Sequence, residues 1–169
     1  MQYIGCLLMA LAGAGMGLWG SRHLHRRAAY LHQTVRLLQV LERQLPYTAQ
    51  PMAVLWRQLA VSGVYEDCRL LRDTLAGLDA DVPFTTAFAA ALEQARGEDL
   101  LSAAGYRLLS ECGAGCGRYD LTRQTEHLHH YRLAAEEMAD ALSAEAVTKG
   151  RLYRVMGVAG GVAVSLLLI

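Results

Sequence analysis

The sequence predicts an all-helical protein in which a cytoplasmic bundle of about six helices carries a transmembrane helix at each end. Three observations support this. Residues 3–20 contain no charged side chain, and neither do residues 155–169. Between them, apolar residues recur at helical spacing, and no convincing alternation of apolar and polar residues predicts a strand. The composition, with 53% hydrophobic residues and a formal net charge of zero, fits one domain with a modest core.

Each uncharged stretch is short but long enough to cross a bilayer. A helix rises about 1.5 Å per residue and the hydrocarbon core is about 30 Å thick, so residues 3–20 reach about 27 Å. The second span reaches a similar length as residues 152–169, with Arg154 extending towards the headgroups. A cleaved signal peptide is the alternative for the first span. Such peptides carry basic residues before the apolar run, and none precedes Tyr3.

Basic residues flank the middle of the chain at both ends. Arg22, Arg26 and Arg27 follow the first span, while Lys149 and Arg151 precede the second. The positive-inside rule therefore puts residues 22–149 in the cytoplasm and both termini outside.

The middle segment divides at proline and glycine. The first helix continues out of the membrane through Ala28–Leu45, and Pro46 and Pro51 interrupt it. The last helix begins near Tyr119 and runs on into the second span, with an inward stripe that includes Leu128, Ala135 and Leu142. Between them we expect four further helices: from Pro51, at its first position, to Val61; Tyr65–Ala76; Pro83–Gly97; and Asp99–Cys112.

No residue pattern indicates catalysis, and we expect neither an enzyme nor a cofactor. No nucleophile elbow, phosphate-binding loop, HExxH or dinucleotide fingerprint is present, and nothing indicates a small-molecule substrate. The neutral net charge predicts no nucleic-acid partner. We therefore expect no catalytic residues.

Histidine and cysteine clusters are the remaining candidates for chemistry. Glu126 and His129 have the Glu-x-x-His spacing of a di-iron site, but no second copy supplies the other ligands. We therefore expect no metal and read the histidines as solvated or interfacial. Cys112 and Cys116 are four apart, which is not a CxxC pattern, and with Cys68 they are expected to be ordinary thiols.

Each span carries a pair of small residues at helix-packing spacing. Gly13 and Gly17 lie in the first span, and Gly157 and Gly161 lie in the second. Such pairs let helix backbones approach closely in lipid. Gly17 and Gly157 both lie about one turn from the basic end of their span. We therefore predict that the two spans pack against each other through these four glycines.

The segment from residue 113 to residue 128 contains the most specific motif. Its glycines Gly113, Gly115 and Gly117 favour a helix break or a close approach of another backbone. Gly113, Gly117, Arg118, Asp120 and Gln124 form a G-x-x-x-G-R-x-D-x-x-x-Q pattern. This pattern resembles the stage III sporulation protein AB family. The C-terminal Lys149-Gly-Arg-Leu-Tyr-Arg-Val-Met-Gly-Val run and the early Leu41-Glu42 … Tyr47 … Pro51-Met52 are similar too.

The resemblance implies a helical bundle similar to the cytoplasmic domain of type II secretion platform proteins. It implies a non-enzymatic platform or adaptor of the sporulation channel between mother cell and forespore, in the mother-cell membrane around the forespore. The implied partners are a secretion-type ATPase and other membrane subunits of the channel. The motif residues would then either support helix packing or form a surface that contacts the ATPase or a neighbouring channel subunit.

A different function class also fits the residues. A stand-alone membrane sensor or regulator would use the histidines or thiols. Bound metal or redox-dependent folding would support the sensor, whereas co-purification with the ATPase would support the platform.

Overall fold

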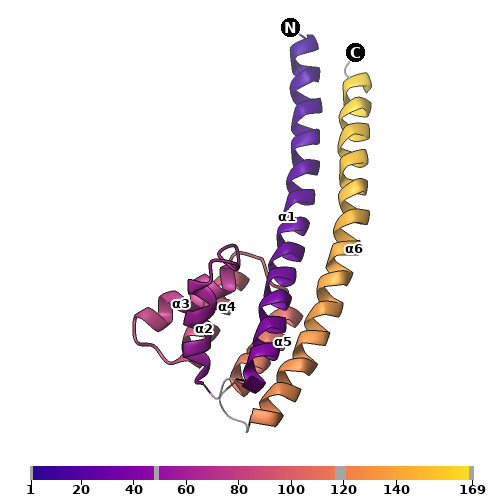
Figure 1. The fold of residues 1–169 in the computed structure, drawn as a ribbon. Coiled ribbons are helices and arrows are strands. Elements are labelled where there is room, and N and C mark those ends of the chain that lie inside the picture. Colours follow the sequence, from indigo (N-terminus) through magenta and orange to yellow (C-terminus); the bar gives the residue numbers. More distant parts are fainter. Residues whose placement is uncertain (1, 48–49, 117–120, 168–169) are drawn as a thin grey trace. The chain divides into compact units, whose positions relative to one another are not determined.

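The computed structural model describes the backbone of residues 2–47, 50–116 and 121–167. Side chains are described for residues 22–47, 50–116 and 123–150 and for Val155, Met156 and Ala159. The described chain is helical and contains no strand (Figure 1). Its elements are α1 (Gln2–Gln44), a 3-10 helix (Leu45–Tyr47), α2 (Met52–Val61), α3 (Arg69–Asp79), α4 (Phe84–Gly97), α5 (Ala103–Gly115) and α6 (Leu121–Leu167).

The chain forms two compact units. The first comprises residues 1–28 and 140–169, and the second comprises residues 29–139. In the first unit, the early part of α1 and the late part of α6 lie side by side and antiparallel (Figure 1). The prediction that both helices continue without a break beyond the bundle is confirmed, since each is one helix in the structure.

No helix within the described part of the chain is long and apolar enough to cross a membrane. The predicted spans over 3–20 and 152–169 fall almost wholly on residues whose side chains lie outside that description. The same holds for Gly13, Gly17, Gly157 and Gly161. Both spans and their glycine contacts therefore stay predictions.

The second unit buries one face of α1 and one face of α6. Side chains three or four positions apart on α1 are buried, as the periodicity predicts. On α6, Leu128, Ala135 and Ala139 are buried too, whereas Met138 is half-buried. The buried α1 side chains include Leu31, Thr34, Val35, Leu38, Leu41 and Leu45.

An aromatic cluster forms the core between the short helices. The ring of Trp56 in α2 meets Phe84 and Phe88 of α4 edge to face, at centroid distances of 5.1 and 5.8 Å. Trp56 also donates its indole N–H to the carbonyl of Leu71 in α3 at 3.3 Å. A methyl group on Gly77 of α3 would lie 2.6 Å from the Cβ of Ala87 in α4, so glycine lets these two helices approach. Together these contacts join α2, α3 and α4.

Four helix starts differ from the sequence prediction. The third helix begins at Arg69 instead of Tyr65 and runs to Asp79 instead of ending at Ala76. Gly63 has a φ of +68°, and Cys68 is extended, so the chain makes a turn before it enters α3. No side-chain hydrogen bond caps the start of α3 at Cys68, so no capping residue marks this start in the sequence.

The fifth helix begins at Ala103 instead of Asp99. The side chain of Ser102 accepts a hydrogen bond from the backbone N–H of Gly105 at 3.1 Å, which caps the helix there. Pro51 and Pro83 each lie one residue before their helix, with ψ near 143°, so they are N-caps instead of first helical residues. The prolines still mark the starts of α2 and α4.

Candidate interaction surface at the glycine-rich segment

The glycines of the family-like motif begin inside α5, where they form a packing surface. Gly113 and Gly115 are both buried. A Cβ on Gly113 would collide with the ring of Phe88 in α4, and a Cβ on Gly115 would collide with the imidazole of His127 in α6. The helix therefore continues through these glycines to Gly115. The sequence predicted either a helix break or a close approach of another backbone at these glycines. The structure shows a close approach at Gly113 and Gly115, and the groups that approach are side chains.

The other motif residues are only partly described. Gly117, Arg118 and Asp120 lie outside the described residues. Gln124 is half-buried on the first turns of α6. Gly113 thus packs against Phe88 in the structure. That the motif residues form a surface for a partner stays a prediction.

Aromatic and polar contacts continue this surface across α5 and α6. The ring of His127 packs against Tyr131 at a centroid distance of 4.6 Å. The hydroxyl of Tyr131 donates to Glu111 of α5 at 3.2 Å. His130 meets Tyr131 edge to face at 5.5 Å. Two of the neighbouring histidines, His127 and His130, therefore share a contact with the ring of Tyr131.

A charged cluster joins α1 to α6 within the second unit. The carboxylate of Glu42 accepts from Arg132 Nε at 2.6 Å, and its other oxygen lies 2.6 Å from His129 Nδ1. Arg132 also donates to Glu136 at 2.7 Å. The side chains of Glu42 and Arg132 are only 20% and 13% exposed, so this pair is shielded from water.

The electrostatics of Glu42 follow from these contacts. Burial by itself would raise the pKa of Glu42, but the hydrogen bonds from His129 and Arg132 outweigh it and hold the pKa below its ordinary value. Glu42 is therefore ionised at neutral pH and acts as a fixed anchor for the α6 side chains.

The predicted chemical candidates are used for packing. His129 contacts Glu42, 87 positions away, instead of forming a site with Glu126. No group of three or more His, Cys, Asp or Glu among the described residues is arranged to hold a metal ion. Cys68, Cys112 and Cys116 are free and buried.

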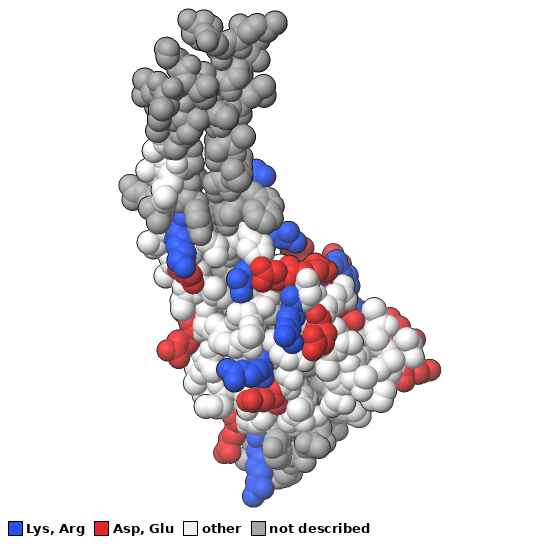
Figure 2. All heavy atoms as spheres, turned by 180° about the vertical axis from the view of Figure 1, so that it is seen from behind, with Lys and Arg blue, Asp and Glu red and all other residues white. Residues whose placement is uncertain are grey.

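Charge on the visible face of the molecule is mixed. Figure 2 shows acidic and basic side chains interspersed over this face, with no large area of one sign. This distribution matches the zero net charge.

Sequence reasoning missed the cluster of Glu42, His129 and Arg132. Glu42 lies in a segment that carries the family resemblance, and this was the available signal. Its partners on α6 are 87 and 90 positions away. Nothing in local spacing connects residues so far apart.

The fold and this surface define a class of protein: a helical protein whose distinctive glycine, histidine and charged residues join helices to one another. The chain matches the model of the family described as stage III sporulation protein AB over residues 2–169. It belongs to that family, as the residue pattern predicted. The comparison with curated proteins found no match. The comparison with solved structures found none either.

Proposed function

We propose that this sporulation-family protein is a non-enzymatic platform or adaptor subunit of the channel complex between mother cell and forespore. It docks a cytoplasmic secretion-type ATPase and contacts other membrane subunits of the channel. The observation that carries the proposal is the match to the sporulation family, which extends over residues 2–169.

The construction of residues 29–139 supports an adaptor. The residues that distinguish this unit are used to lock helices together: Gly113 admits Phe88, and Glu42 pairs with Arg132. A subunit that passes force or position between partners needs such fixed helix packing. A sensor that works through its thiols needs them accessible, whereas Cys68 and Cys112 are 3% and 1% exposed.

The sequence supports anchoring in the mother-cell membrane around the forespore. Residues 3–20 and 152–169 are the proposed spans, and both termini then lie outside the cytoplasm. Arg22 and Arg26, which follow the first span, are exposed in the structure. Their side chains are thus available to lipid headgroups on the cytoplasmic side.

Co-purification of the solubilised full-length protein with the channel ATPase tests the proposal. We expect the ATPase to be retained in a fixed ratio and to be retained equally by the segment 22–149. A Gly97→Ala variant serves as a control and should retain the ATPase as the wild type does, because a methyl group there would meet no atom within 4 Å. Folded protein that retains no ATPase would contradict the proposed docking role.

A further inference from the structure

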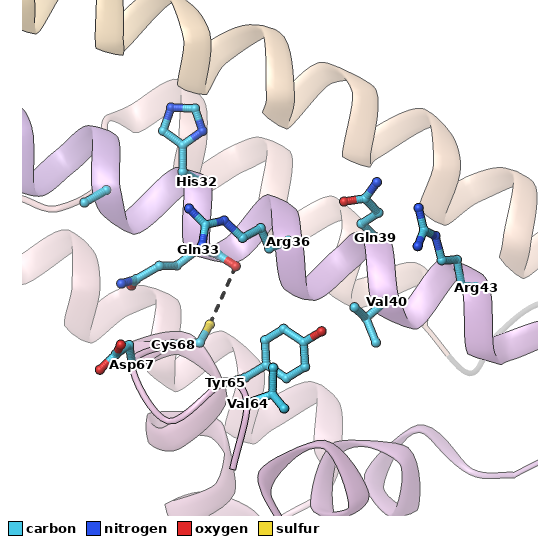
Figure 3. Close-up of a pocket in the computed structure, with 11 residues that line it drawn as sticks. His32, Gln33, Arg36, Gln39, Val40, Arg43, Val64, Tyr65, Asp67 and Cys68 are labelled. Carbon is cyan, nitrogen blue, oxygen red and sulfur yellow. Dashed lines mark hydrogen bonds between the residues drawn. The ribbon is translucent and has the colours of Figure 1, made fainter. Parts of the chain in front are cut away.

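A groove of about 720 Å³ runs along α1 in the unit of residues 29–139 (Figure 3). One wall is the uncovered face of α1, where His32, Arg36 and Arg43 follow one another along the helix. The opposite wall is the turn before α3, which contributes Val64 and Tyr65. Neither the platform packing nor the glycine-rich surface uses this groove.

The length of the groove suits an extended partner. Its α1 wall begins at Ala29 and ends at Arg43, which corresponds to about 21 Å at the helical rise of 1.5 Å per residue. A compact ligand would fill only part of that length. A second helix of about four turns, packed alongside α1, would fill it.

The charge of the groove is basic. Arg36 and Arg43 are exposed, and no ion pair connects either of them to another described residue. His32 lies beside them along the same helix. Asp67 is the one acidic side chain among the described residues that line the groove. The groove therefore favours a negatively charged occupant.

Apolar side chains line the same groove. Val64 is 74% exposed, and Tyr65 and Val40 are half-buried beside it. A purely ionic ligand would gain no binding free energy from contact with these apolar side chains. An occupant with an apolar stripe next to acidic side chains would contact both kinds of wall.

Cys68 holds the two walls together at the base of the groove. Its thiol donates to the backbone carbonyl of Gln33 on α1 at 3.9 Å (Figure 3). Burial raises the pKa of Cys68, so the thiol stays protonated at neutral pH. It is a structural contact and supplies neither a nucleophile nor a metal ligand.

We infer that this groove docks an acidic amphipathic helical segment of a partner protein, with acidic side chains on Arg36 and Arg43 and apolar ones on Val40, Val64 and Tyr65. The inference rests on the proposed function only in requiring that an adaptor has protein partners. It assigns the contact face and the chemistry of the bound segment.

Site-specific photo-crosslinking of the full-length protein in sporulating cells tests the inference. The photoreactive residue p-benzoylphenylalanine replaces Val64 inside the groove and, as a control, the exposed Leu133 on α6. We expect the Val64 position to cross-link to a partner segment that mass spectrometry maps to a net-negative stretch with apolar residues three and four apart. The Leu133 position should not give this product.

Charge reversal supplies the second arm. The double variant R36E/R43E should lower the yield of the Val64 product about tenfold, because two attractions become repulsions. R107E, an exposed arginine outside the groove, is the matched control and should leave the yield unchanged. Circular dichroism verifies that each variant is folded.

Several outcomes would overturn the inference. These are no product at Val64, a product with lipid or with a second copy of this chain, a neutral or basic partner segment, or a yield that R36E/R43E leaves unchanged. The platform proposal fails separately. Failure to retain the ATPase would contradict that proposal, and an acidic helix cross-linked at Val64 would still support the groove.

Discussion

Replacing Gly113 with alanine tests whether the motif glycine is there for packing. The added Cβ would lie 2.5 Å from Cε1 of Phe88, well inside the 3.5–4.0 Å of an ordinary carbon contact. Phe88 has little room to move, since it is 3% exposed and is held between Trp56 and Phe84. Either the ring or helix α5 must shift.

The expected magnitude is the difference between two opposing effects. Overpacking a core costs about 1–3 kcal/mol. Alanine in place of glycine within a helix contributes about 1 kcal/mol in the stabilising direction. We therefore expect Gly113→Ala to lower the free energy of unfolding by about 1 kcal/mol, and by up to about 2 kcal/mol if the ring cannot adjust.

Urea and thermal unfolding of the segment 22–149, followed by circular dichroism, provide the assay. The wild-type segment should be mainly helical and unfold cooperatively. The matched control is Gly97→Ala at the end of α4, where a methyl group meets nothing within 4 Å and should be neutral or stabilising. At about 3–6 °C per kcal/mol for a domain of this size, the two alanine variants should melt several degrees apart.

A double variant identifies Phe88 as the cause. Phe88→Leu removes the ring that collides with the new methyl group, so it should cost less stability in the Gly113→Ala background than in the wild type. If Gly113→Ala is as stable as Gly97→Ala, or if Phe88→Leu costs the same in both backgrounds, the packing role of Gly113 is wrong.

Five further predictions rest on the structure and on the sequence. Glu42→Gln should lower the free energy of unfolding by about 1–2 kcal/mol at pH 7, because Arg132 and His129 lose their charged acceptor, and an unchanged urea midpoint would contradict this. Since the native pKa of Glu42 is lowered, wild-type protein should lose this contribution as pH falls below the ordinary value of 4.5, and Glu42→Gln should lose less over the same range. Cys68 should react with iodoacetamide at pH 8 only as fast as the native protein opens, because burial raises its pKa; immediate labelling would show an accessible thiol. Cysteines introduced at Gly17 and Gly157 should cross-link within one chain, whereas products only between chains would mean that the glycines serve partner subunits. In intact cells, a cysteine introduced between residues 22 and 149 should resist a membrane-impermeant reagent, and its labelling would reverse the predicted topology.

Local sequence determined the helical character of this protein and most of its helix positions. Apolar spacing placed the long helix through residues 28–45, and Pro51 and Pro83 marked the starts of α2 and α4 within one residue. These features depend on backbone geometry and on neighbours within one or two turns, so they can be read from the chain. The residue pattern from 113 to 128 likewise identified the family that the whole-chain match shows.

The tertiary structure alone decided which side chains meet. Glu126 and His129 lie one turn apart on α6, at the spacing of a metal-binding pair. In the structure His129 instead contacts Glu42, which lies 87 positions earlier in the chain. The glycines predicted a close approach of another group. Only the tertiary structure shows that the approaching groups are the side chains of Phe88 and His127. Contacts between distant segments depend on how the buried helix faces fit together, and no local pattern records that fit. The basic groove along α1 has the same origin, because its second wall comes from a turn that the sequence placed inside a helix.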